Sequence, residues 1–92
     1  MNKFMMQQAQ KLQAQLLKAQ EELATLMVEA SSGGGAVTVV MNGQQAIQSV
    51  KISKEVVNPE DVEMLEDMVL TAVKEAQVKA QEAAAQKMGG LN

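Results

Sequence analysis

Three lysines near the start of this 92-residue chain have the spacing best suited to binding a ligand. Lys3, Lys11 and Lys18 recur at steps of eight and seven, with Gln7 and Gln15 between them, so a helix would place all five on one face. Residues 1–20 contain no acidic side chain. A row of lysines separated by neutral donors can follow a phosphate backbone without reading bases. The alternative is an ordinary solvated helix face.

The composition excludes most catalytic chemistry. The chain contains no Cys, His, Trp, Tyr or Arg, so a thiol nucleophile, a disulfide framework, a structural zinc site and a Ser-His-Asp triad are all ruled out. With Phe4 as the only aromatic residue, it has no base-stacking platform for single strands. Without Arg, bidentate contacts to guanine cannot form, so any nucleic-acid recognition should be weakly sequence-specific. We therefore expect no enzyme, no metal, no cofactor and no small-molecule substrate.

Two further patterns are better explained as structure than as sites. Gly33-Gly34-Gly35 leads into a β-branched run, whereas a phosphate-binding loop needs Gly-Lys-Ser/Thr leading into a helix. An acidic group could bind a hard cation, but acids are expected in the first turn of any helix, and no second ligand cluster accompanies them. This group comprises Glu60, Asp61, Glu63, Glu66 and Asp67.

The lysines lie in a segment with a heptad repeat, which predicts a first helix of about 25 residues and about 37 Å. Such a helix is longer than a compact chain of this size needs, so it should project or be covered by another chain. Asn2 is the expected N-cap. We expect Leu12, Leu16 and Leu23 to be buried against another helix. The apolar seam comprises Met5, Ala9, Leu12, Leu16, Ala19, Leu23 and Leu26.

Short β-branched runs follow the first helix. Residues 36–41 and 46–53 predict two strands, and residues 27–31 could supply a third. Asn42-Gly43 between the first two runs is typical of a type I′ hairpin turn, because both residues tolerate the left-handed conformation.

A second helix is predicted from Asn58 as the cap and Pro59 as the first helical position, to an end at Gly89-Gly90. Its seam turns from valine and leucine to alanine after residue 73, so we expect the distal part to be weakly packed. Lys74, Lys79 and Lys87 on this helix are secondary candidates for phosphate contacts. The seam comprises Val62, Leu65, Val69, Ala72, Ala76, Ala80 and Ala83.

The chain as a whole resembles the YbaB/EbfC family of nucleoid-associated DNA-binding proteins. The resemblance begins in residues 6–13 and 20–24 and continues through Gly35 and the strand and turn at 37–43. It is strongest at residues 63–69. Further agreement lies at residues 50–52, Ala72, Ala76 and Lys87-Met88. Essentially the whole chain is covered, in the right order.

The resemblance implies an α+β fold: a long helix, a short antiparallel three-stranded sheet and a long helix, in one domain over residues 1–92. It also implies a tweezer-like homodimer whose strands join across the interface while the helices project. The partner would be double-stranded DNA in the cytoplasmic nucleoid, for nucleoid organisation or gene regulation. A membrane partner is not expected. A prefoldin-like chaperone or coiled-coil interaction module is the alternative.

Overall fold

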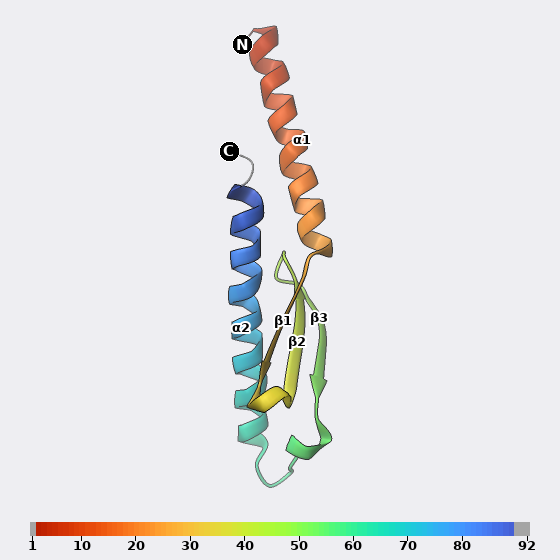
Figure 1. The fold of residues 1–92 in the computed structure, drawn as a ribbon, viewed down its shortest axis with the longest axis vertical. Coiled ribbons are helices and arrows are strands. Elements are labelled where there is room, and N and C mark those ends of the chain that lie inside the picture. The colour runs from red at the N-terminus through yellow and green to blue at the C-terminus, as the bar shows by residue number, and fades with distance from the viewer. Residues whose placement is uncertain (1, 90–92) are drawn as a thin grey trace.

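The computed structural model describes residues 2–89, which form an elongated molecule of 68 × 17 × 16 Å (Figure 1). Helix α1 leads into a three-stranded sheet, and helix α2 follows; short 3₁₀ turns lie at Gly33–Gly35 and Lys54–Val56. The strands pair antiparallel in chain order, β1-β2-β3. The predicted α+β architecture is therefore confirmed. The elements are α1 (Lys3–Thr25), β1 (Met27–Ser32), β2 (Val37–Asn42), β3 (Ile47–Ile52) and α2 (Val62–Gly89).

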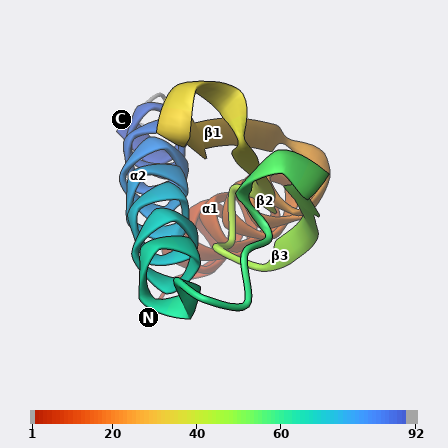
Figure 2. The same cartoon turned by 90° about the horizontal axis from the view of Figure 1, so that it is seen from below.

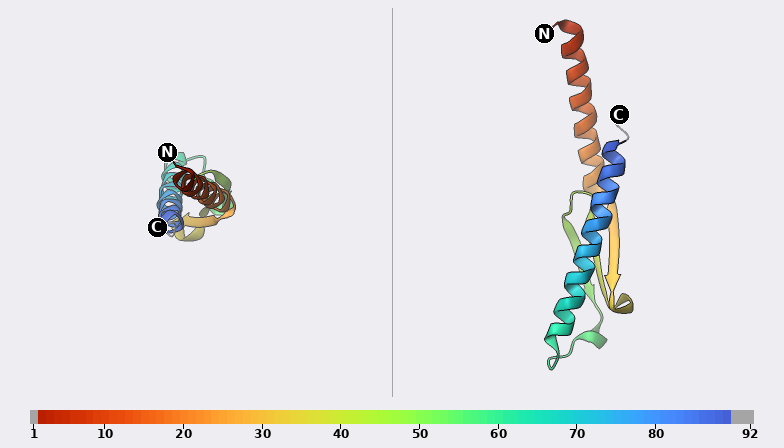
Figure 3. Two further views of the ribbon diagram at one scale, coloured as in Figure 1. Left: turned by 90° about the horizontal axis from the view of Figure 1, so that it is seen from above. Right: turned by 90° about the vertical axis from the view of Figure 1, so that its left-hand side faces the viewer.

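Helix α1 begins where the sequence predicts, because the side-chain oxygen of Asn2 accepts a hydrogen bond from the Met5 amide at 2.8 Å. It ends at Thr25, and Leu26 is already extended. Only Ala19 and Leu23 of this helix are buried. The N-terminal part of α1 runs beyond the end of α2 into solvent (Figures 1 and 3).

The core lies between α2 and one face of the sheet (Figure 2). Strand β2 is central, and its alternate residues Val37, Val39 and Met41 are fully buried. Val39 pairs with Ala30 of β1 on one side and Val50 of β3 on the other. Strand β3 forms one edge of the sheet and is exposed along its whole length.

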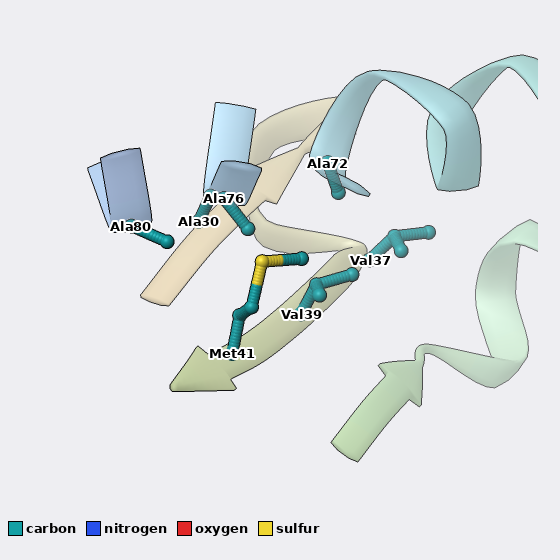
Figure 4. Packing of buried hydrophobic residues seen from close by; sticks show 7 residues of the cluster. All are labelled: Ala30, Val37, Val39, Met41, Ala72, Ala76 and Ala80. Atoms are coloured by element: carbon teal, nitrogen blue, oxygen red, sulfur yellow. The ribbon is translucent and has the colours of Figure 1, made fainter. Parts of the chain in front are cut away.

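The middle of α2 is closely packed as far as Ala80, which corrects the expectation of weak packing after residue 73. Residues 81–89 are exposed or half-buried. Ala72, Ala76 and Ala80, called here the alanine stripe, are each 0% exposed and face Val37, Val39 and Met41 (Figure 4). A methyl side chain lets the helix backbone approach the strands, and the long Met41 side chain fills the remaining space. The larger Val62 and Leu70 of the same helix remain exposed.

Two local predictions are wrong. The β2–β3 connection spans residues 43–46, and its positive backbone angle is at Gln45 (φ 65°) instead of Gly43, so it is no type I′ Asn-Gly turn. Helix α2 begins at Val62, because Asp61 caps it by accepting from the Met64 amide at 3.3 Å. Asn58 instead stabilises the preceding turn by accepting from the Glu60 amide.

Candidate nucleic-acid interface

The five residues of the predicted site on α1, called here the lysine stripe, are all exposed. Lys3 and Lys18 lie about 22 Å apart along the helix axis, from a rise of 1.5 Å per residue. The stripe is about a third of a turn away from the apolar seam. The two surfaces of α1 are therefore separate, and a partner on the seam would leave the lysines accessible. The stripe comprises Lys3, Gln7, Lys11, Gln15 and Lys18.

The stripe occupies the part of α1 that no other described element covers. Every residue in the range 3–18, called here the arm, is exposed. Burial was expected for three leucines of the seam. Leu23 is buried, but Leu12 is 50% exposed and Leu16 is 36% exposed within one chain. Lys11 and Gln15 also line an open groove on the arm together with Leu12.

The β2–β3 loop holds the base of the arm. The Gly43 amide donates to the carbonyls of Leu23 and Leu26, both at 2.9 Å. Asn42 donates through its side chain to the Ala24 carbonyl at 3.1 Å. These carbonyls belong to the last turn of α1 and the residue after it, where carbonyl oxygens lack N–H donors from within the helix. Gln44 adds a side-chain bond to the Gln20 carbonyl at 3.0 Å. We call Asn42, Gly43 and Gln44 the hairpin clamp.

The contacts at the clamp explain why Asn and Gly suit these two positions. Asn42 is buried, and its side-chain oxygen accepts from the Gln44 and Ala46 amides, both at 2.9 Å, while its nitrogen reaches α1. A Cβ at Gly43 would lie 2.8 Å from Leu23 Cδ2 and 3.0 Å from the Leu23 carbonyl oxygen. The Asn42-Gly43 pair was noted in the sequence as a sign of a hairpin turn. In the structure, Gly43 instead allows the loop backbone to approach the backbone of α1 at Leu23.

The second-helix candidates lie in a different environment from the stripe. Lys74 is exposed on α2. Lys79 donates to the Glu29 carbonyl of β1 at 2.7 Å, and Lys87 forms an ion pair with Glu22 of α1 at 2.6 Å. Lys79 and Lys87 are therefore engaged with other elements of the same chain, whereas Lys74 has an orientation open to solvent. The structure does not bring these three lysines into the stripe.

The Lys87–Glu22 ion pair links the two helices near the base of the arm. The hydrogen bond and the charge of Lys87 lower the pKa of Glu22, and the charge of Lys18 adds to this effect. Both side chains are 42% exposed, so solvent screens the interaction. Because Glu22 keeps Lys87 beside α1, one further lysine lies close to the inner end of the stripe.

Neither metal nor membrane chemistry is indicated by the described residues. Within residues 2–89, acidic side chains do not gather into a group of three that could hold a metal ion. The helices in this range also lack a segment both long and apolar enough to cross a membrane.

A family model for the YbaB/EbfC DNA-binding family matches residues 1–92, the whole of the sequence. The chain belongs to this family. Bacterial relatives of this YbaB/EbfC chain carry the name nucleoid-associated protein. One from Chloroflexus aurantiacus is 53% identical over 91 residues, covering 95% of this chain and 91% of the relative. One from Pelotomaculum thermopropionicum is 54% identical over 87 residues, covering 95% and 83%.

The fold of the YbaB/EbfC chain also matches a solved structure. The crystal structure of an uncharacterized protein from Helicobacter pylori has a TM-score of 0.86 over 99% of this chain and 97% of that one. The two sequences are only 17% identical, so this similarity establishes the shared fold. The resemblance inferred from the sequence is confirmed by both the family model and the relatives.

Proposed function

We propose that this YbaB/EbfC protein binds double-stranded DNA without catalysis and with low sequence specificity, in nucleoid organisation or gene regulation. The observation that carries the proposal is the lysine stripe, displayed on an arm that no other described element covers. Lysines spaced along about 22 Å of helix can contact several phosphates of a duplex. Membership of a DNA-binding family and the names of the bacterial relatives support this function over a prefoldin-like chaperone or coiled-coil module. The location that follows is the nucleoid, in the cytoplasm.

The distribution of charge supports an orientation for the bound protein. The net charge is −3, yet residues 1–20 carry three lysines and no acid. All eleven acidic residues lie in the remainder of the chain, with five lysines. A phosphate backbone therefore attracts the arm and repels the body. We infer that the arm contacts DNA while the sheet and α2 face away.

We further propose that the chain forms a homodimer. Strand β3 presents an unpaired edge, and its apolar residues Ile47, Val50 and Ile52 are between 42% and 52% exposed. Beside them, β3 and α2 form an apolar groove. Pairing of two β3 edges would cover these surfaces and project two arms like tweezers, each with its own stripe. The groove is lined by Ile52, Val62, Leu65, Glu66, Val69, Leu70 and Val73.

The DNA-binding proposal is tested by the salt dependence of duplex affinity. Replacing Lys3, Lys11 and Lys18 by Gln keeps helix propensity nearly constant. Because each phosphate contact releases about one counterion, the parent's log affinity should fall linearly with log salt, and the triple variant should bind more weakly with a shallower slope. The loss should be similar on unrelated duplexes, since phosphate contacts carry no base information.

A matched pair of double variants separates the stripe from net charge. Lys3→Gln with Lys11→Gln should flatten the slope, whereas Lys51→Gln with Lys54→Gln, an equal charge change near the opposite end of the molecule, should not. Equal effects would place the contacts elsewhere, with Lys74, Lys79 and Lys87 as the next candidates. A parent protein without salt-sensitive duplex binding would contradict the proposed function, and suppression of client aggregation would then indicate the chaperone alternative.

A further inference from the structure

The only aromatic side chain of the protein is on the basic face of the arm and not on its apolar seam. Phe4 is seven residues before Lys11 and fourteen before Lys18, so these three share one face of α1. Phe4 is also 67% exposed, more than any other large hydrophobic side chain that the structure describes. A partner helix on the seam would therefore leave the ring uncovered.

The position of Phe4 along α1 gives the ring no role in the core. It lies in the first turn, at the end of the arm that extends past α2 (Figure 3). The nearest buried residue of the same helix is Ala19, about 22 Å away along the axis. A partner that covered the ring would gain free energy from the apolar surface removed from water.

The surroundings of Phe4 indicate what that partner is. Lys3 precedes it, and Gln7 and Lys11 follow on the same face in the next two turns. Two arm tips brought together would place these lysines against like charges, which opposes contact between copies. Duplex DNA instead offers phosphates to the lysines and stacked base pairs to the ring. Some architectural proteins that bind the minor groove insert an apolar side chain such as Phe as a wedge between base steps.

We propose that Phe4 is a wedge that inserts between base pairs of the duplex bound by the lysine stripe, so that the protein kinks DNA. This inference rests on the proposed function and adds a deformation to it. Phosphate contacts set the salt dependence of affinity, whereas the wedge sets the bend and adds affinity that is insensitive to salt. Low sequence specificity would remain, with a preference for flexible pyrimidine–purine steps that unstack easily.

Substitution of Phe4 by Ala, with Met6→Ala as the matched control, tests the wedge. Met6 is two residues further on, 50% exposed, and lies almost opposite Phe4 around the helix. End-to-end energy transfer on a duplex labelled at both ends measures the bend, and anisotropy over a salt series measures affinity. The parent and Met6→Ala should both kink the duplex by about 20–90°. Phe4→Ala should leave the duplex straight and bind about five-fold or more weakly, with an unchanged salt slope. Phe4→Leu, which keeps an apolar wedge, should retain most of the kink.

Three other results of these experiments would overturn the proposed wedge. A Phe4→Ala variant that bends DNA like the parent would overturn the wedge, and so would a parent that binds with the expected salt slope but leaves the duplex straight. A lower sedimentation mass for Phe4→Ala with unchanged bending would identify the ring as a contact between copies, again overturning the proposal. In these cases the DNA-binding function stands, whereas loss of all salt-sensitive binding in the parent contradicts that function itself.

Discussion

The Gly43 amide donates to the Leu23 carbonyl oxygen at 2.9 Å, so the tip of a β-hairpin caps the C-terminal end of a helix twenty residues earlier in the chain. Helices usually satisfy these carbonyls with the residues that follow directly. Here the Leu26 amide also donates to the Glu22 and Leu23 carbonyls, and the hairpin adds a donor from a different element. It can do so because Leu26 turns the chain into β1 and β2 returns it to the same place. The direction of α1 is therefore fixed by the sheet.

Gly43→Ala should destabilise the protein by about 1–3 kcal/mol, because the new methyl group meets Leu23 at distances that require the loop or the helix to move. Urea unfolding followed by circular dichroism measures the change. Gly89→Ala, at a helical position with open space around it, is the control and should be neutral or slightly stabilising. An unchanged midpoint for Gly43→Ala would show that the clamp does not hold α1.

Ala76→Leu should cost about 1–3 kcal/mol or more, since Ala76 is fully buried and three added carbons have no space between α2 and the sheet. Gln77→Leu, one residue later on the exposed side of the helix, should change the free energy of unfolding little. Thermal melts of both variants provide the comparison. Similar melting of the two would mean that the alanine stripe is loosely packed after all.

The ion pair between Lys87 and Glu22 gives a pH-dependent contribution to stability. Because Lys87 lowers the pKa of Glu22 in the folded state, the contribution is complete above the ordinary carboxyl value of 4.5 and is lost as the pH falls through the lowered value. The stability difference between the parent and Lys87→Gln should thus be constant near neutral pH and shrink in acid. Lys74→Gln, with the same charge change on the same helix, should lack this trend. High salt should reduce the difference.

Leu16→Asp tests whether the homodimer covers the apolar seam of the arm as well as the β3 edge. A carboxylate placed in a covered seam should weaken the dimer. Leu16 is already 36% exposed within one chain, so the fold of the single chain should survive. Sedimentation equilibrium at micromolar concentration should give a lower mass for this variant than for the parent. Leu17→Asp, at a neighbouring exposed position off the seam, is the control. Parent-like masses for both would remove the seam from the interface.

The order of the elements could be predicted because it depends on local patterns. The heptad repeat and the Asn2 cap define α1, and β-branched runs define the strands. Helix α2 started later than expected because Asn58 accepts from the Glu60 amide in a separate turn, whereas Asp61 accepts from the Met64 amide in the first turn of the helix. The local sequence therefore suggests which residues can cap a helix, but it does not establish which of them begins α2.

Packing between distant elements could not be predicted in the same way. Alanines were expected to pack weakly because burial was judged from side-chain size, yet Ala80 is buried since small side chains allow close approach to the sheet. The contacts of Lys79 with Glu29 and of Lys87 with Glu22 join residues far apart in sequence. The sequence therefore identified the candidate lysines. It did not show which of them bind other groups of the same chain.

The hairpin clamp is also the point about which α1 would rotate relative to the sheet. Phe4 lies nineteen residues from Leu23, which is about 28 Å along α1. At that radius, a rotation of about 7° at the clamp moves the ring by about 3.4 Å, one base-pair step of DNA. Small changes in the bonds made by Asn42 and Gly43 are therefore amplified at the far end of the arm. Substitutions at the base, far from any phosphate, should shift which base step is contacted before they alter how tightly DNA is held.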